Sequence, residues 1–299
     1  MANIIENFKE SFRKATGMTV DEAVASAKRQ SDVSNKSGKN VRFEGNVNLS
    51  DNYKNSLNDI VKFYQKEFKI TPHATIHPFS DMMDEDEDDY EDTLGLAETE
   101  PDKMGQLGVG LRYLDTKGEP KAKAIAKDDV EVGWHPKNSG TINQTPTHEL
   151  GHALFGTLFP DKNTSSNAKK VDIYKNGKKD KRLYGAFDLY YDSLNDLGIS
   201  DLSADKDKVI KETGKISDYA IGSTVDKQGR SIIDPHEVIA ESLVDYYYNR
   251  KKAAPLSQAI VKRLKNSGGL YRFEQAGGID LAPTNDSFIK NLRRYNVVQ

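Results

Sequence analysis

Residues 148–152 read His-Glu-Leu-Gly-His and lie within a largely apolar segment. On an α-helix, positions i and i+4 project from one face about one turn apart, so His148 and His152 can bind one metal ion together. Glu149 lies between them, where it can accept a proton from water beside the metal. The spacing therefore restricts this segment to a helix and predicts a zinc-dependent peptidase centre on it.

The flanking residues favour a helix over Pro146–Phe159. Thr145 suits the cap, and the proline after it is tolerated at the first helical position. Leucines recur at every fourth position from Leu150, which gives an apolar stripe, and Pro160 ends the run. A five-residue pattern also arises by chance, with histidines that serve only the core or the surface, so the interpretation depends on a third ligand.

Catalytic zinc commonly has three protein ligands. The continuation typical of metzincins is absent, because Phe155 and Leu158 occupy the positions of its glycine and its third histidine. The remaining common ligand is a glutamate from a later helix. Residues 234–247 predict such a helix, since Asp234 and Pro235 give it a cap and a first residue.

That later segment carries an acidic stripe through an otherwise apolar body. Glu237, Glu241 and Asp245 recur at every fourth position. Burying such carboxylates unpaired would cost several kcal/mol, and a bound cation removes the problem. We therefore expect Glu237 to be the third zinc ligand. We expect Glu241 to accept the free ring N–H of a zinc-bound histidine.

Two alternatives apply to this helix start. Asp234 and Glu237 also match a capping box, which would place the glutamate there for local reasons. A capping box does not explain Glu241, so the ligand interpretation is favoured. His236 could compete as a ligand, but we expect it to be a neighbour of the metal centre that supports the ligands or faces solvent.

Two stretches that follow the motif helix, Ile216–Ala220 and Pro235–Leu243, complete a wider pattern. Together with the motif they resemble the gluzincin-like zinc peptidase domain of anthrax-toxin lethal factor and its relatives, which also occurs in bacteriophage head-associated proteins. The resemblance covers residues 143–248, with a longer stretch than usual before the glutamate helix. It implies zinc ligands His148, His152 and Glu237, general base Glu149, supporting carboxylate Glu241, and a phenol, Tyr219, that stabilises the oxyanion. The alternative for Tyr219 is a packing role.

The expected fold class is α+β: a zincin-like metallopeptidase with a small mixed or antiparallel sheet packed on the motif helix, plus helical extensions. We expect an N-terminal helix and polar linker over residues 1–48, the peptidase domain over 49–255, and a C-terminal helix and tail over 256–299. Within these, the patterns predict helices at 4–30, 51–68, 185–197 and 256–266, a linker at 31–45, strands at 73–79 and 129–135, and a hairpin of 107–114 with 121–126. One of the last three strands is expected to be the edge that pairs with substrate. The acidic run at 84–89 predicts a solvated loop.

Composition limits the partners. The chain has 299 residues and a net charge of −3, so it offers no electrostatic case for nucleic acid or an anionic membrane. It has no cysteine, which excludes disulfides and thiol ligands. Its start lacks the features of a signal peptide, and no apolar run is long enough for a membrane span. We expect a cytoplasmic or virion-associated protein.

The expected function is hydrolysis of a protein or peptide by zinc-activated water, in a virion-associated or maturation protease that contacts capsid or portal proteins. Two alternatives keep the fold. In one, the chain is a structural virion or assembly component with little or no activity. In the other, it is a toxin-like effector protease. Fold and motif do not name the substrate.

Overall fold

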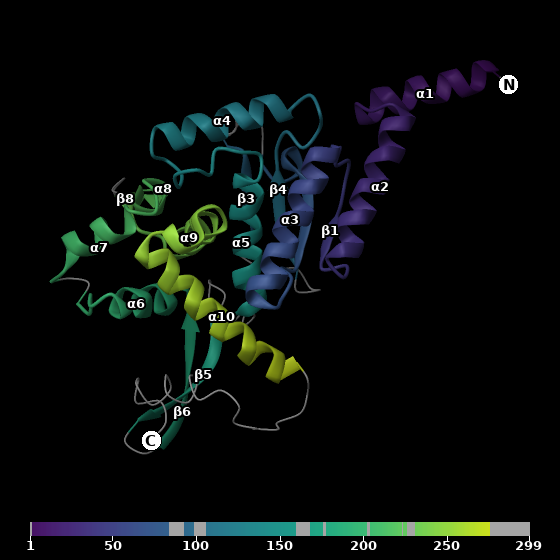
Figure 1. The fold of residues 1–299 in the computed structure, drawn as a ribbon. Helices are drawn as coiled ribbons and strands as arrows, with labels where there is room; N and C mark the ends of the chain where they lie inside the picture. Colours follow the sequence, from purple (N-terminus) through teal and green to yellow (C-terminus); the bar gives the residue numbers. More distant parts are fainter. Residues whose placement is uncertain are drawn as a thin grey trace.

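The computed structural model describes residues 2–83, 93–98, 106–159, 168–175, 178–201, 204–222, 224–225 and 231–275. Helices dominate, and they surround a small four-stranded sheet (Figure 1). The expected α+β class with a small mixed sheet is therefore confirmed. The acidic run at 84–89 and the tail beyond residue 275 lie outside the described residues.

The sheet has the strand order β1-β2-β4-β3. β1, β2 and β4 are parallel to their neighbours, whereas β3 is antiparallel to β4 and lies at one end of the sheet. β4 is buried along its whole length because strands flank it on both sides. The bounds are β1 (Val41–Phe43), β2 (Ala74–Pro78), β3 (Gly95–Ala97) and β4 (Leu107–Leu111).

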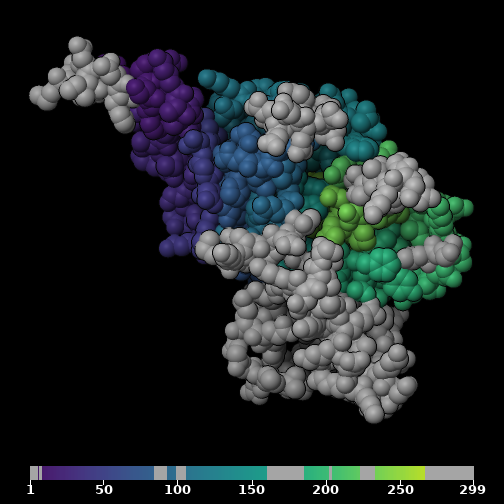
Figure 2. Space-filling view, turned by 180° about the vertical axis from the view of Figure 1, so that it is seen from behind, coloured from purple at the N-terminus to yellow at the C-terminus, as the bar shows by residue number. Residues whose placement is uncertain are grey.

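The described helices are α1 (Ala2–Thr16), α2 (Val20–Lys36), α3 (Asp51–Phe68), α4 (Glu119–Glu131), α5 (Gln144–Leu158), α6 (Ala186–Asp196), α7 (Lys206–Thr213), α8 (Tyr219–Gly222), α9 (Pro235–Asn249) and α10 (Pro255–Gln275). Short 3-10 turns lie at Phe79–Asp81 and Arg250–Lys252. Two hairpins pair β5 (Ala168–Lys175) with β6 (Lys178–Gly185), and β7 (Thr224–Val225) with β8 (Ser231–Ile232). Figures 1 and 2 place α1 and α2 at one edge of the molecule. In the described part of the chain, none of the helices combines the length and apolar character that a membrane crossing needs.

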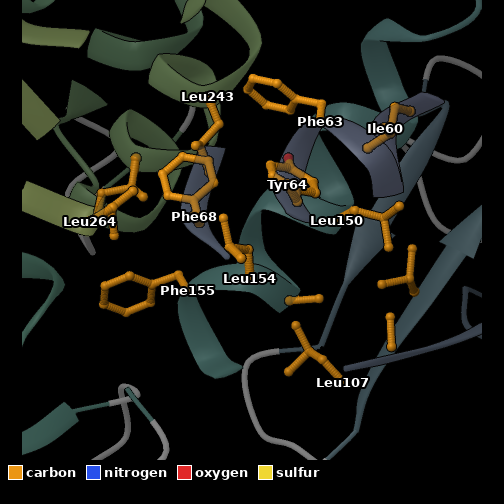
Figure 3. Packing of buried hydrophobic residues seen from close by; sticks show 14 of the residues in the cluster. Ile60, Phe63, Tyr64, Phe68, Leu107, Leu150, Leu154, Phe155, Leu243 and Leu264 are labelled. Carbon is orange, nitrogen blue, oxygen red and sulfur yellow. The ribbon is translucent and has the colours of Figure 1, made fainter. Parts of the chain in front are cut away.

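A single apolar core joins the sheet to the helices. Tyr64 and Phe68 of α3, Leu154 of α5, Leu243 of α9 and Leu264 of α10 are all buried in it (Figure 3). The core also contains a long-range hydrogen bond. Tyr64 Oη of α3 donates to the carbonyl oxygen of Thr147, in the first turn of α5, at 2.7 Å. The start of α5 is thereby tied to α3.

Gly151 lets α5 approach α9 closely. A Cβ atom at this position would lie 3.1 Å from Leu243 Cδ1 and 3.5 Å from Ala240 Cα. Real Cβ contacts are rarely as short as the first of these, so a larger side chain would push the helices apart. The glycine inside the His-Glu-Leu-Gly-His motif therefore has a packing reason: it brings the two predicted ligand-bearing helices together.

Several predicted elements are confirmed. The helices at 51–68 and 185–197, and the strands at 73–79 and 107–114, are present with small changes in their bounds. The helix expected at 256–266 lies within the longer α10. Two elements near the N-terminus differ. The helix at 4–30 is split at Gly17, which has a left-handed φ of +71° before the capping box at Thr19. The linker at 31–45 instead continues α2 and then forms β1, because Val33 and Val41 are fully buried.

The predicted hairpin and the strand at 129–135 are wrong. Residues 121–126 belong to α4. Proline is favoured in the first turn of a helix, where Pro120 lies, and the alternating alanines and lysines that follow have high helix propensity. Residues 129–131 end that helix, and a turn follows at Gly133, whose φ is +85°. β4 lies inside the sheet. None of the three segments proposed as the substrate-binding edge is therefore an edge strand.

Replacing Gly151 by valine should lower the free energy of unfolding by about 1–3 kcal/mol, because the branched side chain would overlap Leu243. Urea denaturation followed by circular dichroism measures this loss. Combining the change with Leu243→Ala should give a loss smaller than the sum of the two single losses, since the truncated leucine makes room. Strict additivity would show that these two positions do not interact.

Candidate metal centre

The motif lies at the start of α5, which begins at Gln144 rather than at Pro146. The leucines of the stripe from Leu150 to Leu158 are fully buried and face the core. His148 and His152 occupy the opposite side, toward α9, and keep slight exposure. The amphipathic pattern thus directs the leucines inward and leaves the histidines at a cleft.

The side chains of His148, His152 and Glu237 meet in one group. His148 Nε2 lies 3.2 Å from His152 Nε2 and 3.0 Å from Glu237 Oε2. His152 Nε2 lies 3.5 Å from the same carboxylate oxygen. Ligand atoms bound tetrahedrally to zinc at about 2.0–2.1 Å lie about 3.3 Å apart, so the three separations match that geometry. Two imidazoles and one carboxylate are also a usual donor set for catalytic zinc. These residues therefore fit a zinc ion.

Glu241 lies one turn beyond Glu237 on α9 and is fully buried. Its Oε1 atom lies 2.8 Å from His148 Nδ1, and its Oε2 atom accepts a 2.7 Å hydrogen bond from Ser217 Oγ. An ionised carboxylate only accepts, so His148 carries a proton on Nδ1. The Nε2 atom of His148 faces Glu237 and His152, so a metal that displaces the proton from Nε2 would meet a lone pair directed into the group.

The charges of this group call for a cation. Burial by itself would lower the pKa of His148, but hydrogen bonds to Glu237 and Glu241 raise it well above its ordinary value. Burial likewise opposes ionisation of Glu237, yet the neighbouring histidines hold its pKa far below the usual range. The pKa of Glu241 is lowered from 4.5 to about 2 by His135 and His148, against the effect of burial. Both carboxylates are thus ionised inside the protein, where a metal ion would balance them.

Glu149 is nearly inaccessible and lies beneath β3. A Cβ atom at Gly95 would come within 2.9 Å of Glu149 Cγ and Oε1, so only a glycine allows the strand to pass this close. Burial raises the pKa of the Glu149 carboxyl and outweighs the opposite effect of His148 and His152. A carboxyl with a raised pKa is well suited to take up and release a proton near neutral pH.

Tyr219 is the first residue of the short helix α8 and lines the same cleft. Its ring centroid lies 5.6 Å from that of His148, nearly perpendicular to it. Burial raises the pKa of the phenol well above 10, and Glu237 and Glu149 raise it further. The phenol therefore keeps its proton and is available as a hydrogen-bond donor.

His236 and Asp234 define the start of α9. The Asp234 side chain accepts the backbone N–H of His236 at 2.8 Å and so caps the helix. The Glu237 carboxylate lies against the two motif histidines, so the capping box is not the reason for its position. The His236 ring packs edge-to-face on Phe155 and lines the cleft. It is a neighbour of the three-residue group, not a member of it.

Asp245, the third acidic residue of the stripe, serves another purpose. It accepts the backbone N–H of Ala254 at 2.7 Å and the side-chain amide of Asn249 at 2.8 Å. These bonds connect the end of α9 to the start of α10. Its burial is therefore explained by local hydrogen bonding, away from the metal group.

His135 is a site residue that the sequence analysis missed. Its Nδ1 atom lies 3.0 Å from Glu241 Oε1, the same oxygen that His148 contacts. The two partners are 106 residues apart in the chain, and the sequence pattern around residue 135 predicts an alternating strand. Only the folded arrangement of α9 and the turn after α4 identifies this histidine.

The ligand group opens into a cleft of about 410 Å³. Its lining includes the motif residues, Tyr219 and the start of α9, and also β3 with the apolar side chains of Met82, Met83 and Leu96. The cleft thus brings residues of β3, the two histidines and Glu149 into one lining. Comparisons of the chain with protein-family models, with curated proteins and with solved structures found no match.

Replacing Glu241 by alanine should lower the free energy of unfolding by about 3–5 kcal/mol, because it leaves the buried donors of His148 and Ser217 without their acceptor. Urea denaturation in the presence of a chelator measures this loss without a contribution from metal. Glu131→Ala is a matched control, since that carboxylate pairs with Lys127 at the surface. The control should change stability by no more than about 0.5 kcal/mol.

The loss of unfolding free energy in Glu241→Ala should depend on pH. The pKa of Glu241 falls from 4.5 to about 2 on folding, so its contribution is present above pH 4.5 and disappears as the pH falls toward 2. The stabilities of wild type and Glu241→Ala should therefore converge over this range. A difference that stays constant down to pH 2 would contradict the assignment of an ionised buried carboxylate.

Proposed function

We propose that this chain is a zinc-dependent metallopeptidase with a lethal-factor-like, gluzincin type of site. The observation that carries the proposal is the meeting of His148, His152 and Glu237 at separations suited to tetrahedral zinc. Two features support it further. Glu241 directs the His148 lone pair into the group, and Glu149 lies in the same cleft with a raised pKa.

The three ligands would hold a zinc ion, which supplies a Lewis acid that lowers the pKa of water toward neutrality. Glu149 takes a proton from the attacking water and later delivers it to the leaving amine, so the peptide bond gains one water across it. Tyr219 keeps its phenolic proton and donates a hydrogen bond to the carbonyl oxygen as negative charge develops there. His236 borders this space without taking part in the proton transfer.

The cleft supports an extended polypeptide as substrate. β3 lies at the end of the four-stranded sheet, and its residues line the same cleft as the metal group. An extended chain can add to such an edge through main-chain hydrogen bonds, which hold the backbone independently of its sequence. In this proposal β3 takes the role that the sequence analysis had assigned to a later strand.

A peptidase is favoured over an inactive virion component because Glu149 and the donor set lie together in one open cleft. A component used only for assembly has no need of a buried proton acceptor beside that donor set. The virion or cytoplasmic setting, capsid or portal partners, and the alternative of an effector protease stay predictions.

Purified protein should contain about one zinc ion per chain, and Glu237→Ala should lose it on dialysis. The reason is that two imidazoles alone leave the ion without the carboxylate that completes the group and balances its charge. Elemental analysis of dialysed wild type and variant measures the ratio. Full zinc occupancy in Glu237→Ala would exclude this residue as the third ligand. Asp245→Asn, a change on the same helix outside the group, should leave the zinc content unaltered.

Glu149→Gln should lower kcat on denatured, labelled casein by about 10²–10⁴-fold while zinc stays bound, because the amide has the shape of the carboxylate but cannot accept the proton. Turnover and zinc content are measured on the same samples, so loss of metal and loss of the proton acceptor are separated. Undiminished turnover in a zinc-loaded variant would remove Glu149 from its proposed role.

A further inference from the structure

Two turns that are distant in the sequence pair beside the metal group. The Asp218 backbone N–H donates to the Gly133 oxygen at 2.9 Å, and the Tyr219 N–H donates to the Trp134 oxygen at 3.1 Å. A Cβ atom at Gly133 would lie 3.2 Å from the Asp218 carboxylate, and the φ of +85° at this glycine shapes the turn. The pairing places the His135 and Tyr219 rings side by side, next to the cleft that Tyr219 lines.

His135 contacts two parts of the site at once. Its Nδ1 atom is 3.0 Å from Glu241 Oε1. Its ring lies against Tyr219, with centroids 5.4 Å apart and planes 30° from parallel. The side chain is 15% exposed, so these contacts are largely shielded from water. His148 also contacts both the Glu241 carboxylate and the Tyr219 ring.

The hydrogen bond from His135 helps to hold the Glu241 carboxylate in one orientation. Oε1 of Glu241 accepts hydrogen bonds from His148 and His135, and Oε2 accepts one from Ser217. Because a carboxylate is an acceptor only, His135 donates from Nδ1. The three donors come from three separate segments and restrict rotation of the carboxylate about its terminal bond. Without His135, Glu241 would have one partner per oxygen and more freedom to turn away from His148.

We propose that His135 is a positioning residue of the metal centre, acting through Glu241 on the orientation of His148 and through its ring on the placement of the Tyr219 phenol. The inference rests on the proposed peptidase function, and it adds a residue from the turn after α4 to that site. His135 belongs neither to the metal-ligand group nor to the lining of the cleft. It therefore acts on zinc binding only through Glu241 and on substrate only through Tyr219.

The two contacts can be separated by substitution. Asparagine places an amide N–H near the position of Nδ1, so His135→Asn keeps the donor to Glu241 but lacks the ring. Phenylalanine keeps a ring against Tyr219 but has no donor, so His135→Phe removes the hydrogen bond to Glu241. Both variants also lose the 4.0 Å contact between His135 Nε2 and Asp129 Oδ2, so that loss does not distinguish them. His77→Asn, on β2, is the matched control for loss of a histidine outside the site.

Zinc affinity and turnover should then respond differently. Chelator competition should show zinc bound about 10–100-fold more weakly by His135→Phe, as expected when the hydrogen-bonded support of a ligand is lost. His135→Asn should bind zinc within about threefold of wild type but show a reduced kcat with KM unchanged, by less than the roughly 10²–10³-fold that loss of an oxyanion donor costs. Adding Tyr219→Phe to His135→Asn should lower kcat no further than Tyr219→Phe alone.

Equal losses of zinc affinity and kcat in both variants would show a general structural role and overturn the proposal, as would wild-type values in both. These outcomes leave wild-type zinc binding and cleavage intact, so they do not touch the proposed function. A wild-type protein that binds no zinc would overturn the peptidase proposal and this inference together. The affinity measurement needs no substrate, so it tests His135→Phe even where cleavage is slow.

Discussion

The close contact between α5 and α9 is the constraint on which the rest of the site depends. Gly151 allows the two helix backbones to approach until Leu243 and Ala240 fill the space beside it. At that distance the Glu237 carboxylate contacts Nε2 of His148 and the Glu241 carboxylate contacts its Nδ1. The geometry of the metal group therefore follows from helix packing, because flexible side chains alone would not hold three donor atoms within hydrogen-bonding distance of one another.

The charged side chains at the contact between α5 and α9 determine what this site can bind. Ionised carboxylates in a protein interior are stable only beside partners, and here the partners are imidazoles that can exchange a proton for a metal ion. The hydrogen bond from His148 Nδ1 to Glu241 selects the tautomer whose Nε2 faces the group. Glu149, with a raised pKa, lies on the same cleft. The helix contact thus produces a cation site and a proton acceptor in one place.

Predictions from local patterns succeeded where burial is set by a helix period. The helix at 51–68 and the motif helix are present because their apolar positions repeat every three or four residues and face the core. They failed at 121–135, where alternating residues were interpreted as strands. In the structure these residues form most of α4 and the turn after it, since helix propensity and the left-handed Gly133 outweigh a weak alternation. Position within the sheet, which decides whether a strand is an edge, was not encoded locally.

By itself the sequence determined which side chains can be ligands. The i, i+4 spacing of His148 and His152, and that of Glu237 and Glu241, has this meaning on any helix. Tertiary structure alone decided that these pairs face each other, that Gly95 of β3 lies over Glu149, and that His135 supports Glu241. The reason is separation along the chain: the contacts that complete the site join residues up to 106 positions apart, and no local period carries information over that distance.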